Sequence, residues 1–196
     1  MTTKDTVTLY TRQHENSLYE LKNKGRITNK ELYVRLHMGD ISDFFLERYN
    51  IFVKMAEQII PRSNEIQYPI WCSISKKSCL RPIEKELVYV LEVPRDQVIY
   101  FDGGKWDYVL NDLYIPKDDA DKAAFEKEIA ALGVRDQFNF ITGRYKGMYP
   151  HIEKKIRDSW VRIFEIDEWN EYLVQANLWE IKEEWVVRIV GPGEVL

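Results

Sequence analysis

The 196-residue chain has few of the residues that mark disulfide-rich or metal-binding proteins. It contains two cysteines and three histidines, and the spacing of Cys72 and Cys79 is not that of a metal site. In a reducing compartment we expect two free thiols, with Cys72 on a buried strand. A catalytic cysteine needs a histidine close in space, and the sequence does not place His14, His37 or His151. We therefore predict no metal ligands, and a thiol enzyme is the third alternative among the functions.

The sequence also lacks a membrane-length apolar run and an excess of positive charge. No window approaches the roughly 20 apolar residues of a membrane span, and no apolar signal core opens the chain, so we expect a cytoplasmic protein without a membrane partner. The net charge of −4 gives the whole molecule no electrostatic footprint for nucleic acid. Two interpretations stay open for Lys154, Lys155, Arg157 and Arg162: a local basic face that binds nucleic acid, or a solvated helix face.

What is present is ordinary for a globular protein, with 45% hydrophobic and 31% charged residues. No repeat or linker divides the chain, so residues 1–196 are predicted to form a single domain. Three segments rich in β-branched and aromatic residues predict consecutive strands around which the rest packs. They are Tyr68–Ser75, Val88–Val93 and Gln97–Phe101.

The chain opens with a strand-like segment, Val7–Gln13, followed by a helical pattern over Glu15–Lys24. Gly25 stands where a left-handed helix cap belongs. Polar side chains at the exit of the strand either line a binding site or cap the next helix. Both interpretations stay open for Thr11, Arg12 and Gln13.

The remaining pattern alternates helices and loops before two late strands. A helix over Asp40–Ile60 is expected to bury Ile41, Phe44, Phe45, Phe52, Met55 and Ile59. Further helices are expected over 105–112, from Asp118 to about Gly133, from Pro150 through Ile163, and over Trp169–Leu173. Residues 137–149 are predicted to be an excursion, either a lid or a connecting loop. The late strands are Val174–Ile181 and Trp185–Val190.

Several short motifs are spread along nearly the whole chain. They are Tyr10–Gln13, Tyr68–Trp71, Val93–Pro94, Trp106–Asn111, Ser159–Phe164 and Gln175–Ile181. With these motifs the sequence resembles the bacterial family called domain of unknown function 3841, a resemblance that implies no activity.

The order of the elements is also similar to that of small ADP-ribosyltransferase-like domains. That resemblance implies an α+β fold, a single domain whose central, mostly antiparallel and strongly bent sheet is flanked by helices. It also implies that NAD is the substrate and that a catalytic glutamate stands on a late strand. Gln175–Leu178 occupies the late position here, without a glutamate.

The expected reaction defines the candidate roles. Cleaving the nicotinamide–ribose bond develops oxocarbenium character, which a carboxylate stabilises. Gln175 can bond a ribose hydroxyl, Glu180 is the catalytic carboxylate if the strand register shifts, with Glu183 or Glu184 in its place, and Arg12 can pair with pyrophosphate. These three are the predicted catalytic residues. The predicted NAD-binding residues are Tyr10, Thr11, Arg12, Gln13, Tyr68, Trp71 and Asn177, with a core role as the alternative for Trp71.

Two functions from different classes follow. The first is an NAD-dependent transferase that moves ADP-ribose to a macromolecular target, either nucleic acid or protein. The second is a non-catalytic module of bacterial or phage origin that binds a nucleotide or a protein. A carboxylate on the late strand, facing the cleft, discriminates between them.

Overall fold

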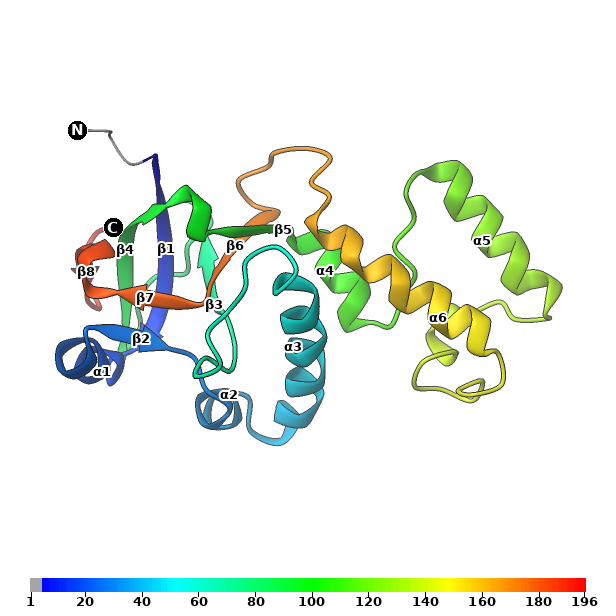
Figure 1. The fold of residues 1–196 in the computed structure, drawn as a ribbon, viewed down its shortest axis with the longest axis horizontal. Coiled ribbons are helices and arrows are strands. Elements are labelled where there is room, and N and C mark those ends of the chain that lie inside the picture. The colour runs from blue at the N-terminus through cyan, green and yellow to red at the C-terminus, as the bar shows by residue number, and fades with distance from the viewer. Residues whose placement is uncertain (1–4) are drawn as a thin grey trace. The chain divides into compact units, whose positions relative to one another are not determined.

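The fold was analysed in a computed structural model that describes residues 5–196 (Figure 1). The strands are β1 (Thr6–His14), β2 (Arg26–Thr28), β3 (Ile70–Ser73), β4 (Glu86–Pro94), β5 (Ile99–Asp102), β6 (Val174–Leu178), β7 (Glu180–Lys182) and β8 (Val186–Val190). The α-helices are α1 (Ser17–Lys24), α2 (Glu31–Met38), α3 (Ser42–Ala56), α4 (Gly103–Leu110), α5 (Asp119–Ala131) and α6 (Pro150–Ser159). Short 3-10 turns are η1 (Gly39–Ile41), η2 (Arg95–Gln97), η3 (Gln137–Asn139), η4 (Trp160–Phe164) and η5 (Glu183–Trp185).

The chain divides into two compact units. The sheet unit comprises the chain up to Phe101 together with Glu168–Leu196, and the helical unit is Asp102–Asp167. The sequence predicted a single domain, and the division into two units does not test that prediction. The α+β class is confirmed, because extensive α-helices accompany a six-stranded sheet with antiparallel strand pairs.

The sheet unit is built on six strands in the order β5-β6-β3-β1-β4-β8. The pairs β1–β3, β1–β4, β3–β6 and β4–β8 are antiparallel, as the sequence predicted, and β2 pairs with β7 in a separate two-stranded sheet. The three strands predicted as the centre of the chain are present as β3, β4 and β5.

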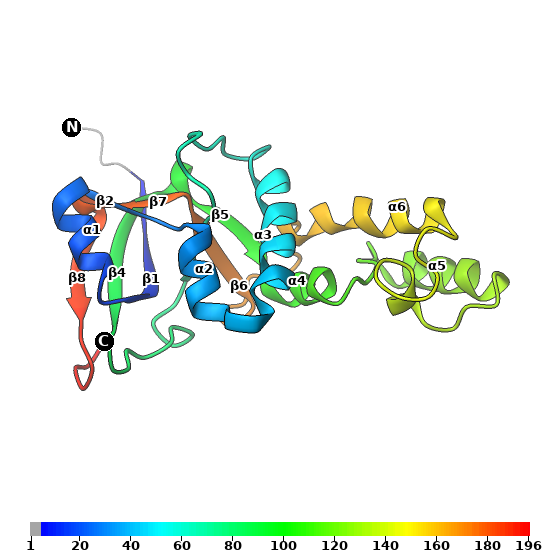
Figure 2. The same ribbon diagram turned by 90° about the horizontal axis from the view of Figure 1, so that it is seen from below.

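The two faces of the six-stranded sheet are covered differently. On one face, alternate residues such as Leu9, Cys72 and Leu91 form a core with Leu21 of α1 and Ile181 of β7. The other face carries Trp71, whose ring contacts the rings of Tyr49 and Phe52 on α3 at 5.3 and 5.2 Å. Figure 2 shows α3 beside β5 and β6. We call this second side the α3 face.

The helix predicted over Asp40–Ile60 is shorter and buries a different stripe. It begins at Ser42 and ends at Ala56, and Ile41, Phe44 and Ile59 are 59%, 42% and 49% exposed. The prediction was based on the largest apolar side chains of the segment, and several of these are exposed. Phe52 is buried as predicted, and the buried apolar positions of α3 follow helical spacing at Leu46, Tyr49, Phe52, Val53 and Ala56. Ser42 and Arg48 of α3 are buried as well.

The helix predicted over Trp169–Leu173 is wrong. This segment forms turns, and Trp169, Tyr172 and Leu173 are exposed. The Asn170 side chain accepts a hydrogen bond from the backbone N–H of Tyr172 at 2.9 Å. Such a local bond offers the backbone an alternative to a helix.

The helical unit matches its sequence prediction closely. Pro150 is in the first turn of α6, and Ile152 and Ile156 are buried, as is Trp160 in the following turn η4. The Trp160 indole N–H donates to the Leu113 carbonyl at 2.8 Å.

Candidate functional site

The most open polar arrangement on the α3 face is a row of three side chains across three adjacent strands. Tyr10 of β1 lies opposite Ser73 of β3, and Ser73 lies opposite Gln175 of β6. Residues paired across strands project to the same side of a sheet. All three are half-buried, so their polar ends border solvent. We call Tyr10, Ser73 and Gln175 the polar row.

Two members of the polar row keep their hydrogen-bonding capacity. Ser73 Oγ donates to the Ser78 carbonyl at 3.2 Å. Within residues 5–196 the Tyr10 hydroxyl and the Gln175 amide have no hydrogen-bond partner in the protein. A phenol and a primary amide on the same face can together donate to and accept from the hydroxyls of a sugar.

A carboxylate stands in the turn that leads into the strand of Gln175. Glu171, in the turn before β6, accepts hydrogen bonds from Ser75 Oγ at 2.7 Å and from Lys77 Nζ at 2.8 Å. Lys77 and then Ser75 lower the pKa of Glu171 below its usual value, so the carboxylate is ionised at neutral pH.

The sequence interpretation missed Glu171, Ser73, Ser75 and Lys77. Because the sequence predicted a helix over Trp169–Leu173, Glu171 was treated as an ordinary surface acid of that helix. The available signal was its position four residues before Gln175, at the entrance to the late strand.

Arg12 lies two residues beyond Tyr10 and projects to the same face. Its Nε is 2.7 Å from the Glu86 carboxylate, and its Nη1 donates to the Arg81 carbonyl at 3.2 Å. The guanidinium is therefore already engaged. A pyrophosphate would have to compete with Glu86 for it.

Strand alternation separates the residues predicted to bind NAD near the start of the chain. Thr11 and Gln13 project to the face opposite Tyr10 and Arg12. Gln13 Nε2 donates to Thr11 Oγ1 at 2.8 Å, and Thr11 Oγ1 donates to the Trp71 carbonyl at 2.7 Å. The structure thus brings Tyr10 and Arg12 to the site and leaves Thr11 and Gln13 on the other side.

Three further predicted residues lie in packed surroundings beside the site. The Trp71 ring packs on Tyr49, Phe52 and Phe101, which fits the core alternative. The other two are Asn177, which is fully buried, and Tyr68, 6% exposed, whose hydroxyl donates to Asn50 Oδ1 at 3.3 Å.

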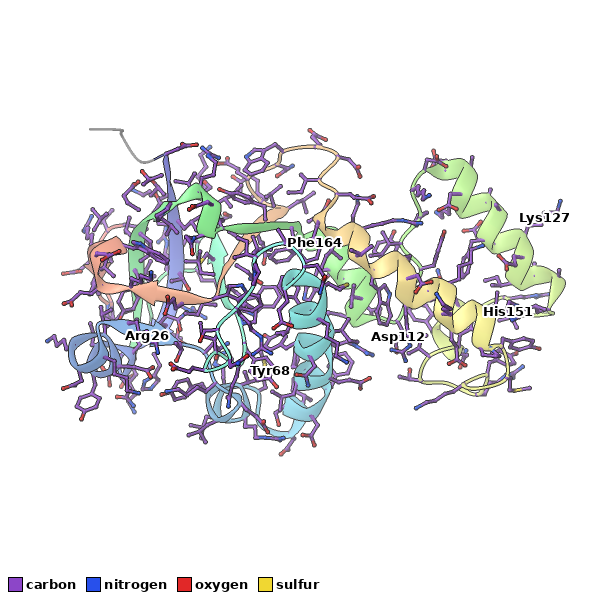
Figure 3. The ribbon with its side chains drawn as sticks, viewed as in Figure 1. Arg26, Tyr68, Asp112, Lys127, His151 and Phe164 are labelled. Carbon is purple, nitrogen blue, oxygen red and sulfur yellow. The ribbon has the colours of Figure 1, made fainter. Side chains whose placement is uncertain are left out.

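Glu180 lies in the two-stranded sheet and has other partners. Its carboxylate is 3.2 Å from Arg26 Nη1 and 3.8 Å from Lys182 Nζ, and Arg26 also pairs with Glu65 at 2.6 Å (Figure 3 labels Arg26). An open hollow of about 640 Å³ borders this network, with Lys24, Gly25, Glu183 and Glu184 on its walls. Glu180 pairs with Arg26 and Arg12 pairs with Glu86, whereas the Gln175 side chain has no hydrogen-bond partner within residues 5–196. The three predicted catalytic residues therefore do not form one cluster.

The cysteines do not have the environment of nucleophiles. Burial raises the pKa of Cys72 to about 12, and burial also raises the pKa of Cys79, against the lowering effect of Arg12. A thiolate is the nucleophilic form of cysteine, and both groups are protonated at neutral pH.

The part of the chain that the structure describes has neither a metal site nor a membrane-spanning helix. No group of three or more His, Cys, Asp or Glu side chains is placed to hold a metal ion there. Within the same residues, no helix has the length and apolarity to cross a membrane.

Comparison with known proteins identifies a family. The model of the family described as domain of unknown function (DUF3841) matches residues 8–187, so the chain belongs to this family. No curated protein and no solved structure matches the chain.

Proposed function

We propose that this member of the DUF3841 family binds NAD on the polar row and transfers ADP-ribose to a macromolecular target. The observation that carries the proposal is that the Tyr10 hydroxyl and the Gln175 amide flank Ser73 on one face, without partners in residues 5–196. Further support comes from the resemblance of the chain to ADP-ribosyltransferase-like domains in the order of its elements.

In the proposed reaction Gln175 bonds a ribose hydroxyl of NAD, and the Tyr10 phenol contacts the same nucleoside. The bond between the ribose C1′ and the nicotinamide nitrogen breaks, and its electron pair leaves with neutral nicotinamide. The positive charge that develops on the ribose is stabilised by a nearby carboxylate. A nucleophilic oxygen or nitrogen of the target then bonds to C1′ and loses its proton to a base.

Glu171 is the carboxylate that best fits this role. It is ionised, it stands four residues before Gln175 in the chain, and Lys77 and Ser75 hold it in place. Glu180, the carboxylate expected from the sequence, is paired with Arg26 in another sheet.

A non-catalytic binding module is the second candidate. The observation that favours it is that the late strand presents the amides of Gln175 and Asn177, with no carboxylate on that face of β6. A neutral amide supports binding but not base catalysis. On this alternative the polar row binds a nucleotide and no bond is broken.

The first experiment is a series of melting curves of the full chain across an NAD titration. A ligand that binds only the folded state stabilises it by about 2.7 kcal/mol at one hundred times its Kd. The proposal predicts a saturable rise in Tm and release of nicotinamide when a target is present. A rise without nicotinamide release supports the second candidate, and no rise at millimolar NAD contradicts both uses of NAD.

A further inference from the structure

The helical unit carries a second surface that the NAD proposal does not use. It lies in the segment between α5 and α6, drawn in yellow-green in Figure 1. Residues 133–149 contain three cationic side chains and one acidic side chain, whereas the whole chain has a net charge of −4. We call Arg135, Phe138, Arg144, Tyr145 and Lys146 the loop patch.

The cations of the loop patch are available. Arg135 and Lys146 are exposed, and neither has an ion-pair partner within residues 5–196. The one carboxylate of the segment, Asp136, is occupied locally. It accepts hydrogen bonds from the Phe138 backbone N–H at 3.0 Å and from the Asn139 amide at 3.4 Å.

The basic residues suggested by the sequence differ in this respect. Lys155 pairs with Glu128 at 2.5 Å, Arg162 pairs with Asp121 at 3.4 Å, and Lys154 pairs with Asp158. The Arg157 guanidinium lies over the Trp160 ring. Lys154, Lys155 and Arg162 are therefore paired within the helical unit, whereas Arg135 and Lys146 of the loop patch have no ion pair within residues 5–196.

Aromatic rings are interleaved with these cations. Phe138 is 51% exposed, and the Arg144 guanidinium lies 4.5 Å from the centre of the Tyr145 ring. The Tyr145 ring also contacts the rings of Phe140 and Tyr149, at 5.7 and 6.0 Å, which hold it in place. His151, at the start of α6, continues this set of rings against Tyr149 (Figure 3).

A hollow of about 280 Å³ lies between the cations. Its walls are formed by Arg135, Arg144 and Tyr145 together with Gly133, Val134, Asp136 and Asn139, so one carboxylate stands among the cations. This volume is just below the range of about 300–1,000 Å³ that is usual for ligand pockets. A hollow with cations on its rim and a ring in its wall suits a phosphate with an attached base.

We propose that the loop patch binds single-stranded nucleic acid. Free cations contact the phosphates, and the exposed rings stack on unpaired bases, which a duplex does not present. An acidic protein surface would use the cations but would leave Phe138 without a role. Single-stranded nucleic acid would then be the macromolecular target of the proposed transfer of ADP-ribose, and in that respect the inference rests on the proposed function.

The test measures binding of labelled oligo(U) and oligo(dT) of about 20 nucleotides by fluorescence anisotropy, without NAD. Wild-type protein is expected to bind at about 50 mM salt and to weaken steeply at about 200 mM. The double variant R135A/K146A removes two phosphate contacts. Its affinity at low salt should fall about tenfold or more, and its log–log salt slope should become shallower by about 1.4.

Two further variants separate charge from stacking. F138A should weaken binding about tenfold with the salt slope unchanged, because it removes a ring and no charge. The matched control K22A/K122A removes two exposed lysines of α1 and α5 and should stay within about twofold of wild type.

The inference is overturned if wild type does not bind at low salt, or if R135A/K146A binds as tightly as wild type. Binding of polyglutamate as strong as that of the oligonucleotides overturns it as well, in favour of an acidic protein. Because NAD is absent, these outcomes do not depend on the NAD titration. The oligonucleotide measurement and the NAD titration therefore test the two proposals separately.

Discussion

Ser75 donates a 2.7 Å hydrogen bond to the carboxylate of Glu171, which joins the segment after β3 to the segment before β6. Lys77 adds a 2.8 Å ion pair to the same carboxylate. These contacts fix the turn that leads into the strand of Gln175. They also give Glu171 a measurable effect on stability.

The first prediction concerns the variant Glu171→Gln and pH. Lys77 and Ser75 lower the pKa of Glu171 in the folded protein below its ordinary value of 4.5. The stabilisation from a lowered pKa is fully present above the unfolded value and is lost as the pH falls through the folded value. Wild type should therefore melt above E171Q at pH 7, and the two melting temperatures should converge as the pH falls from 4.5 through the lowered folded value.

Glu168→Gln is the matched control, because Glu168 is an exposed acid of the same segment without an ion pair within residues 5–196. Its melting temperature should follow that of wild type across the pH series. A constant difference between wild type and E171Q at every pH would show that the ionised form of Glu171 does not contribute.

The second prediction concerns the end of α1. Gly25 has a φ of 67°, and its N–H donates to the Leu21 carbonyl, as the sequence predicted for a left-handed cap. A Cβ at this position would meet no atom within 4 Å, so any cost of Gly25→Ala comes from the backbone conformation alone. We expect a loss of about 1–2 kcal/mol in urea denaturation.

Gly191→Ala is the control for that substitution. The φ of Gly191 is not positive, and an added Cβ would make only an ordinary contact with Glu194 at 3.8 Å. Its free energy of unfolding should change little. Equal losses for G25A and G191A would contradict the role of the left-handed conformation.

The third prediction concerns the start of α5. The Asp118 side chain accepts a hydrogen bond from the Asp121 backbone N–H at 2.8 Å, which satisfies a donor of the first helical turn. Asp118→Ala should destabilise the chain by about 1 kcal/mol. Asp119→Ala, which removes a first-turn charge but no capping bond, should cost less, and the reverse order would refute the assignment of the cap.

The sequence predicted most of the fold where local signals agree. The cap at Gly25, the helix start at Pro150 and the central strands all combine a position-specific residue with a clear hydrophobic period. It failed at Trp169–Leu173, where the Asn170 side chain competes with helix formation. It also placed Ile41, Phe44 and Ile59 in the core, and all three are exposed, although Phe52 of the same predicted stripe is buried.

The site was less predictable because it depends on strand register. Tyr10, Ser73 and Gln175 are far apart in the sequence and meet only through the pairing of β1, β3 and β6. Strand alternation then separates neighbours such as Thr11 from Tyr10, which no local motif encodes. The contacts of Glu171 with Ser75 and Lys77 are equally remote, because these two residues lie more than ninety residues earlier in the chain.

The most direct test of the account is NAD binding to wild type, Gln175→Ala and Gln97→Ala by calorimetry. Gln97 is an exposed glutamine of the same unit and serves as the matched control. Loss of a ligand hydrogen bond costs about 0.5–1.5 kcal/mol, so Q175A should bind NAD about two- to tenfold more weakly than wild type and Q97A. Equal affinities of wild type and Q175A, or no binding by wild type, would contradict an NAD site on the polar row.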